Sequence, residues 1–319
     1  MITYSLRRFL YLIPVWLGIS VLAFGAANLA PGDPAVLILQ RQSGEPPSAE
    51  AVQQLRQVLG LDKPPLTRYL TWMRRAVTGD LGKSYRTGSP VLVTLLEPFP
   101  NTVRLTAIAL FLGVLVSLPL GVLAAVRRDT PVDHVSRIVA LVGTSVPSFV
   151  VGYLLILFFA VSLRLLPAAG SNGWRYIVLP AMTLALSEAG ALTRLTRASM
   201  LEVLGEDYVR TARAKGLPSA LILMRHALRN ALNPMVSLTG IRFGRLLGGA
   251  VIVETVFARP GIGRTVVDSI QDRDYPTIQG FILLMGTLFV IVNLLVDISY
   301  FWLDPRVRLG GRHGIARAS

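Results

Sequence analysis

Residues 101–126 read NTVRLTAIALFLGVLVSLPLGVLAAV and carry no charged side chain after Arg104. About 20 apolar residues in a helix cross the hydrocarbon core of a bilayer, which is about 30 Å thick. This stretch therefore predicts a transmembrane helix. Outward from it in both directions, five further apolar segments reach spanning length, and we expect an all-α, polytopic membrane protein with six transmembrane helices. The five segments are 9–30, 137–162, 176–196, 234–256 and 278–302.

The composition agrees with a membrane protein and excludes several chemistries. Only 16% of the residues are charged and 52% are hydrophobic, with a mean hydropathy of +0.56. A soluble domain carries about 25% charged residues. The chain has no cysteine and three histidines, which excludes a cysteine nucleophile and disfavours a metal site. We therefore assign no catalytic residue and no metal ligand.

The distribution of basic residues predicts the orientation of the chain. The net charge is +14, and Lys and Arg gather before the first segment and in the connections 127–137 and 197–233. Short cytoplasmic connections are enriched in these residues. We expect both termini in the cytoplasm. Because this orientation accounts for the excess of basic residues, we do not predict nucleic-acid binding. The segment 9–30 exceeds the apolar core of a secretory signal, so we expect an uncleaved first helix.

The chain divides into four parts on this basis. They are a first transmembrane helix (1–30), an extracytoplasmic helical insert (31–100), a permease core (101–303) with a cytoplasmic coupling loop (197–233), and a cytoplasmic tail (304–319). The insert predicts one helix between a Ser48 cap and Gly60, a second helix ending at Gly79, and a short third helix between Pro90 and Pro98.

Two motifs resemble catalytic sites but lack essential parts. Residues 79–84 read GDLGKS, yet position 77 is Val where a phosphate-binding loop needs Gly, so we do not predict ATP binding. Gly143-Thr144-Ser145 has no base in the later spans that could activate a serine. We interpret it as a helix-packing or helix-breaking site before Pro147.

The fifth apolar segment combines small and basic residues. Gly240, Gly244 and Gly248 recur every fourth position and predict close helix packing. Arg242 and Arg245 lie on roughly the opposite side of the helix. An arginine within the membrane is costly unless it faces water or an opposite charge. Both arginines therefore either line the translocation path or form an internal ion pair, with Glu188 or Asp297 as partner.

Residues 206–218, EDYVRTARAKGLP, predict a short amphipathic helix in the cytoplasm. Acidic residues open the segment, basic residues follow, and Gly and Pro end it. The charged face alone fits a solvated helix as well as a docking element.

Together with this segment, motifs along nearly the whole chain resemble the permease subunits of binding-protein-dependent ABC importers. The similarity is to the dipeptide, oligopeptide and nickel branch, and in particular to its first permease. The motifs are LRRF at 6–9, APGDP at 30–34, GDLG at 79–82, HALRN at 226–230, LGGA at 247–250, DYP at 274–276 and LDPR at 303–306.

The resemblance implies a function for residues 206–218. In the family this loop docks into an ATPase subunit, and the residues carried over are Glu206, Asp207, Tyr208, Arg210, Ala212, Lys215 and Gly216. Arg210 stands where the general family pattern has Glu. The resemblance also implies a second permease, two ATPase subunits or a fused pair that hold ATP and Mg²⁺, and an extracytoplasmic binding protein. Substrate would enter at an outer mouth formed partly by 163–175 and 257–277.

The expected setting is the lipid of a bacterial or archaeal inner membrane, and the expected cargo is a dipeptide or oligopeptide. Import of nickel or another small solute by the same machine is the first alternative. A membrane-embedded enzyme is the second, disfavoured because no acid–base or metal constellation is found. An ion-gradient transporter is the third, and its buried acids in broken helices are not evident.

Overall fold

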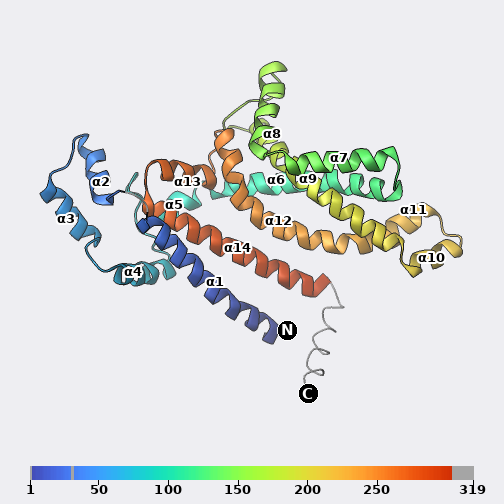
Figure 1. The fold of residues 1–319 in the computed structure, drawn as a ribbon, viewed down its shortest axis with the longest axis horizontal. Coiled ribbons are helices and arrows are strands. Elements are labelled where there is room, and N and C mark those ends of the chain that lie inside the picture. Colours follow the sequence, from blue (N-terminus) through green and yellow to red (C-terminus); the bar gives the residue numbers. More distant parts are fainter. Residues whose placement is uncertain (1, 30–31, 304–319) are drawn as a thin grey trace. The chain divides into compact units, whose positions relative to one another are not determined.

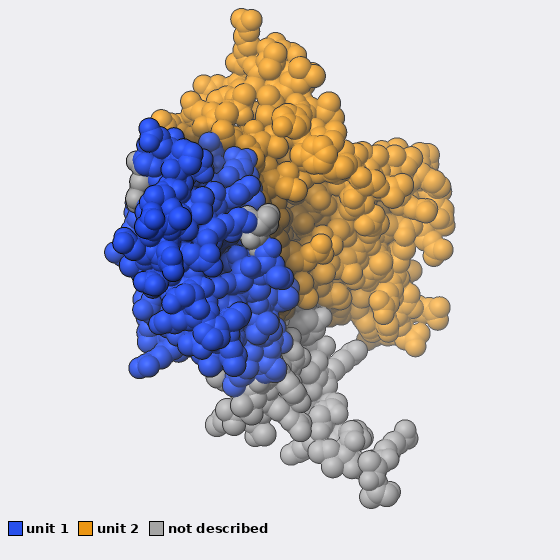
Figure 2. Space-filling model, turned by 60° about the vertical axis from the view of Figure 1, so that its left-hand side comes forward, with its two compact units in different colours: residues 1–102, 260–290 blue, residues 103–259, 291–319 orange. Residues whose placement is uncertain are grey.

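The computed structural model describes residues 2–29 and 32–303, and in these ranges the chain is helical without any β-strand (Figure 1). Side chains of residues 2–12, 42, 233, 237 and 297–303 are not described, and the predicted tail 304–319 lies outside the described residues. The chain forms two compact units, coloured separately in Figure 2. The prediction of an all-α polytopic membrane protein is confirmed.

The first unit contains residues 1–102 and 260–290. Its helices are α1 (Ile2–Leu29), α2 (Pro34–Ser43), α3 (Ala49–Leu59), α4 (Pro65–Val77), α5 (Val91–Leu96), α13 (Ile262–Gln271) and the first part of α14 (Tyr275–Leu303). Ser48 caps α3 by accepting a hydrogen bond from the Ala51 amide, and Gly60 ends it at φ +67°. The three helices expected between residues 48 and 98 are therefore confirmed, whereas α2, capped by Asp33, was not predicted.

Apolar contacts and one polar contact join α1, α5, α13 and α14 within this unit. Val91 and Leu95 of α5 are fully buried against Ile262 and Leu283. Gly280 permits the approach, because a Cβ there would lie 2.5 Å from Val91 Cγ1. Farther along α14, Thr287 accepts a 2.9 Å hydrogen bond from the Trp16 indole, and α1 runs beside α14 (Figure 1).

The second unit contains residues 103–259 and 291–319. Its helices are most of α6 (Phe99–Val126), α7 (Pro131–Ser145), α8 (Ser148–Leu155), the π-helix η1 (Ile156–Ser162), α9 (Arg175–Leu204), α10 (Asp207–Ala214), α11 (Ser219–Leu221), the π-helix η2 (Ile222–Ala227), α12 (Leu228–Val256) and the end of α14. Its largest apolar core is built around Leu105, Leu179, Val253 and Phe257.

Four helical stretches are long and apolar enough to cross a membrane: 91–126, 175–204, 234–256 and 275–296. The total reaches six if two bent helix pairs each count as one span. One is the end of α1 with α2, bent by 63°, and the other is α7 with α8 and η1, bent by 103°. The apolar segment 137–162 is therefore a bent pair of helices and not one continuous helix. Pro147 interrupts it, because proline disfavours helical conformation in the residue before it, and Val146 is extended.

The helix α9 packs against α7 and extends beyond the fourth predicted span. That span was expected over 176–196, and α9 continues through Arg197 to Leu204. The Arg197 guanidinium donates two 2.7 Å hydrogen bonds to Asp133 of α7, a carboxylate with no exposed surface, so the charge does not require the helix to end there. Higher along the pair, a Cβ at Gly190 would lie 2.5 Å from the Ala140 carbonyl oxygen. The expected coupling loop 197–233 thus includes the ends of two long helices.

Candidate functional site

The segment singled out in the connection expected in the cytoplasm folds as α10, from Asp207 to Ala214. The helix ends because Gly216 adopts φ +73°, a left-handed conformation that glycine accepts without strain. Val209 and Ala212 are its only buried residues, and they lie three positions apart on one face. The other side chains of α10 are exposed, so the helix offers most of its circumference to a partner.

Short contacts hold α10 to the ends of both neighbouring long helices. Val209 and Ala212 pack with Ile222 of η2, and Leu204 at the end of α9 completes the cluster. The Tyr208 hydroxyl accepts a 2.8 Å hydrogen bond from the Asn230 amide in the first turn of α12. The helix α10 is therefore in direct contact with the end of α9 and the start of α12.

Apart from the buried Ala212, the residues predicted for coupling lie together on the outside of this element. Glu206, Asp207, Arg210, Lys215 and Gly216 are all exposed. The one ion pair among them joins Arg210 to Asp207 at 3.6 Å, with both side chains more than three-quarters exposed. Such a pair contributes little to stability, so these side chains are free to form new contacts.

Within the fifth predicted span, one of the two arginines has an acidic partner. Arg242 donates a 3.1 Å hydrogen bond to Glu188 of α9, and both side chains are largely buried. Glu188 is thus the partner that the structure gives, whereas the side chain of the other candidate, Asp297, lies outside the description. Arg245 is exposed on α12 in the single chain.

The three glycines of this span lie in different surroundings. A Cβ at Gly240 would overlap Val296 of α14. The close approach of the two helices at this point therefore requires a residue without a side chain. Gly244 is buried. Gly248 is exposed, and a Cβ added there would meet no atom within 4 Å.

A buried carboxylate that the sequence reasoning did not single out organises the GDLGKS segment. Asp274 accepts hydrogen bonds from the Ser84 hydroxyl at 2.5 Å, the Tyr85 amide at 2.8 Å and the Thr277 hydroxyl at 2.7 Å. Ser84, the serine of the segment that resembles a phosphate-binding loop, thus uses its hydroxyl in a structural hydrogen bond. The signal in the sequence was the joint presence of the GDLG and DYP motifs, which this contact brings together.

In the parts of the chain that the structure describes, no group of three or more His, Asp or Glu residues could hold a metal ion. Two solved structures share the fold of this chain. A chain of the inward-facing MetNI methionine ABC transporter matches with a TM-score of 0.56 at 20% identity, over 66% of this chain and 96% of the other. A second match, to an amino acid ABC transporter with histidines, has a TM-score of 0.51 at 19% identity over 65% of this chain and 92% of the other. The fold is that of a membrane component of ABC transporters.

Sequence comparisons give the family. Residues 117–309 match the model of the binding-protein-dependent transport system inner membrane component, and residues 1–106 match the N-terminal model of such membrane components. The glutathione transport system permease protein GsiC of Escherichia coli O6:H1 is 42% identical over 97% of this chain and 99% of its own length. The protein of the same name from Shigella dysenteriae serotype 1 is 41% identical over the same shares.

The chain belongs to the binding-protein-dependent transport system inner membrane component family. It is a permease subunit of an ABC importer of the dipeptide, oligopeptide and nickel branch, and a multi-pass inner-membrane protein rather than an enzyme. The family resemblance read from the sequence is confirmed.

Proposed function

We propose that this permease forms half of the translocation pathway for short peptides and is driven through α10 by separate ATPase subunits. A peptide cargo is supported by the relatives, which are named for glutathione, a tripeptide. The absence of cysteine and the scarcity of histidine favour a peptide over nickel as cargo. The second permease, the two ATPase subunits holding ATP and Mg²⁺, and the extracytoplasmic binding protein are the partners that the family implies.

The observation that carries the coupling proposal is the way α10 is mounted. It is a short helix with an exposed charged face, yet its buried face contacts segments continuous with both α9 and α12. A partner that grips the exposed face can move the two long helices as rigid bodies. We infer that closure of the ATPase dimer around α10 switches the permease from an inward-facing to an outward-facing state.

The remaining parts follow from this orientation. With α10 in the cytoplasm, both termini are cytoplasmic, residues 31–100 form an extracytoplasmic insert and residues 304–319 form a cytoplasmic tail. Arg242 and Arg245 of α12 line the path and offer donors to a peptide carboxylate, with Glu188 holding Arg242 in place until substrate arrives. A maleimide that cannot cross the membrane should label Lys215→Cys from the cytoplasmic side, and labelling from outside would contradict this orientation.

The coupling role can be tested at Gly216 with a closely matched control. Gly216 and Gly44 have φ angles of +73° and +72°, each follows a helix, and neither would place an added Cβ within 4 Å of another atom. A valine in either position suffers the same backbone strain, of about 1–2 kcal/mol or more. Only Gly216 adjoins the proposed docking helix.

We expect Gly216→Val to abolish peptide-stimulated ATP hydrolysis and uptake by the complete transporter in proteoliposomes, with normal membrane insertion. Gly44→Val should retain both activities. If Gly216→Val hydrolyses ATP and imports peptide at the rate of the natural protein, α10 is not the coupling element. If nickel and not peptide stimulates the natural complex, the cargo proposal is wrong and the coupling proposal stands.

A further inference from the structure

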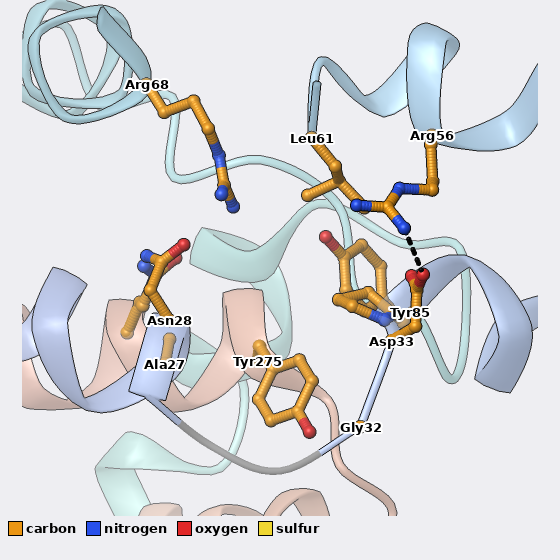
Figure 3. Close-up of a pocket in the computed structure, with 11 residues that line it drawn as sticks. Ala27, Asn28, Gly32, Asp33, Arg56, Leu61, Arg68, Tyr85 and Tyr275 are labelled. Carbon is orange, nitrogen blue, oxygen red and sulfur yellow. Dashed lines mark hydrogen bonds and ion pairs between the residues drawn. The ribbon is translucent and has the colours of Figure 1, made fainter. Parts of the chain in front are cut away.

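A polar cavity of about 500 Å³ lies within the first compact unit (Figure 3). It is formed where the end of α1, the starts of α2 and α14, and residues of α3 and α4 come together. Its size is within the range of about 300–1,000 Å³ that is usual for small-molecule sites. The polar side chains that line it include Asn28, Asp33, Arg56, Arg68, Tyr85 and Gln279.

The charges in this cavity do not cancel. Arg56 donates a 3.0 Å hydrogen bond to Asp33, and the pair is drawn dashed in Figure 3. The second cation, Arg68, points into the cavity and has no carboxylate within ion-pair distance among residues 2–29 and 32–303. Its guanidinium carbon lies 6.0 Å from the centroid of the Phe24 ring, a contact that leaves its N–H groups available. The cavity thus holds one uncompensated positive charge.

Two neutral polar groups also line the cavity. Gln279 of α14 is only 9% exposed, and in the described structure its side-chain amide makes no hydrogen bond. Its amide is not among the buried polar atoms left without a partner, so it is open to the cavity and can donate a hydrogen bond to a ligand there. The Tyr85 hydroxyl lines the same space, and burial raises the pKa of this phenol, which keeps it protonated as a donor.

These groups are held in place by contacts outside the cavity. The Tyr69 hydroxyl lies 2.8 Å from the Ser20 hydroxyl, and its ring packs edge-on against Phe24 at 5.4 Å, so α4 and Arg68 are fixed on α1. The hydrogen bond from the Tyr85 amide to Asp274 positions Tyr85. Arg68 and Tyr85 are therefore held by contacts that a ligand in the cavity would not disturb.

We propose that this cavity is a second substrate site, in the extracytoplasmic part of the permease, that binds the carboxylate of a small solute such as a short peptide. Arg68 pairs with the carboxylate, and Gln279 and Tyr85 donate hydrogen bonds to it. A monocarboxylate fits better than a phosphate dianion because one cation is uncompensated. Leu61 and the Tyr275 ring supply apolar surface for the solute's side chains. The peptide class rests on the proposed function, whereas the carboxylate site does not.

Binding to the full chain in phosphatidylcholine nanodiscs tests this site without any ATPase. The probes are trialanine, trialanine amide and inorganic phosphate, measured by calorimetry. We expect trialanine to bind and its amide to bind about ten- to a hundredfold more weakly, as the loss of a charge-assisted hydrogen bond predicts. Arg68→Gln should weaken trialanine by a similar factor. Arg74→Gln, on the exposed side of the same helix, should leave affinity unchanged.

Two further variants keep the result interpretable if Arg68→Gln misfolds. Tyr85→Phe and Gln279→Leu each remove one donor and should weaken trialanine without altering the amide. The inference is overturned if amide and acid bind equally, if none of the three variants changes affinity, or if phosphate binds more tightly than trialanine. Failure here with intact peptide uptake refutes only this site, whereas the coupling test at Gly216 is independent of it.

Discussion

The ion pair between Asp133 and Arg197 allows a quantitative prediction of how much stability the chain loses when the pair is broken. Asp133 has no exposed surface and accepts three hydrogen bonds, two from the Arg197 guanidinium at 2.7 Å and one from the Asp129 amide at 3.1 Å. In Asp133→Asn the guanidinium loses its counter-charge, and one former acceptor position becomes a donor facing it. Removing one partner of a buried pair costs about 3–5 kcal/mol, and we take about 3 because Arg197 is 21% exposed.

Thermal unfolding of the purified chain in detergent measures this loss. At about 2 °C per kcal/mol for a large chain, we expect Asp133→Asn to lower Tm by about 6 °C. Asp129→Asn is the control, because it removes an exposed ion pair to Arg128 and asparagine tolerates the φ of +61° at that position. Its Tm should be unchanged. Equal Tm values for Asp133→Asn and the natural chain would refute the reasoning. An equal fall in Tm in both variants would show that the loss arises from the turn at Asp129 and not from the ion pair.

Two further perturbations probe the interior of the second unit. Gly190→Ala should lower Tm, because its Cβ would overlap the Ala140 carbonyl and overpacking costs about 1–3 kcal/mol, whereas Gly249→Ala on α12 has open space and should not. Arg242→Glu should destabilise the chain by placing two carboxylates together, and exchanging the charges in the double variant with Glu188→Arg should recover most of the loss. Thermal unfolding measures both, and a double variant no more stable than Arg242→Glu would show that the pair is not coupled.

Local signals in the sequence predicted the elements that depend on neighbours in the chain. Ser48 and Gly60 predicted both ends of α3, because a cap and a left-handed glycine act within one turn. The helix α10 was predicted because acidic, basic and glycine signals follow one another in order. The helix-breaking interpretation before Pro147 agrees with the structure, although its 103° angle depends on tertiary packing.

Features that depend on contacts between residues distant in the chain could not be predicted from the sequence. Arg197 looks like a span boundary until Asp133, on another helix, neutralises it. The sequence allowed either Glu188 or Asp297 as the ion-pair partner of Arg242. These acids lie on different helices, so the choice depends on how the helices pack. The cavity around Arg68 draws its lining from five helices and three of the connections between them, so no short motif indicates it.

The close fit of α7 on α9 limits how the permease can bend. The two helices are joined at one end by the Asp133–Arg197 bonds and farther along by backbone contacts at Gly143 and Gly190. Helices fastened at several levels can tilt together but cannot slide past one another. Cross-links between α7 and α9 should therefore leave the transport cycle running.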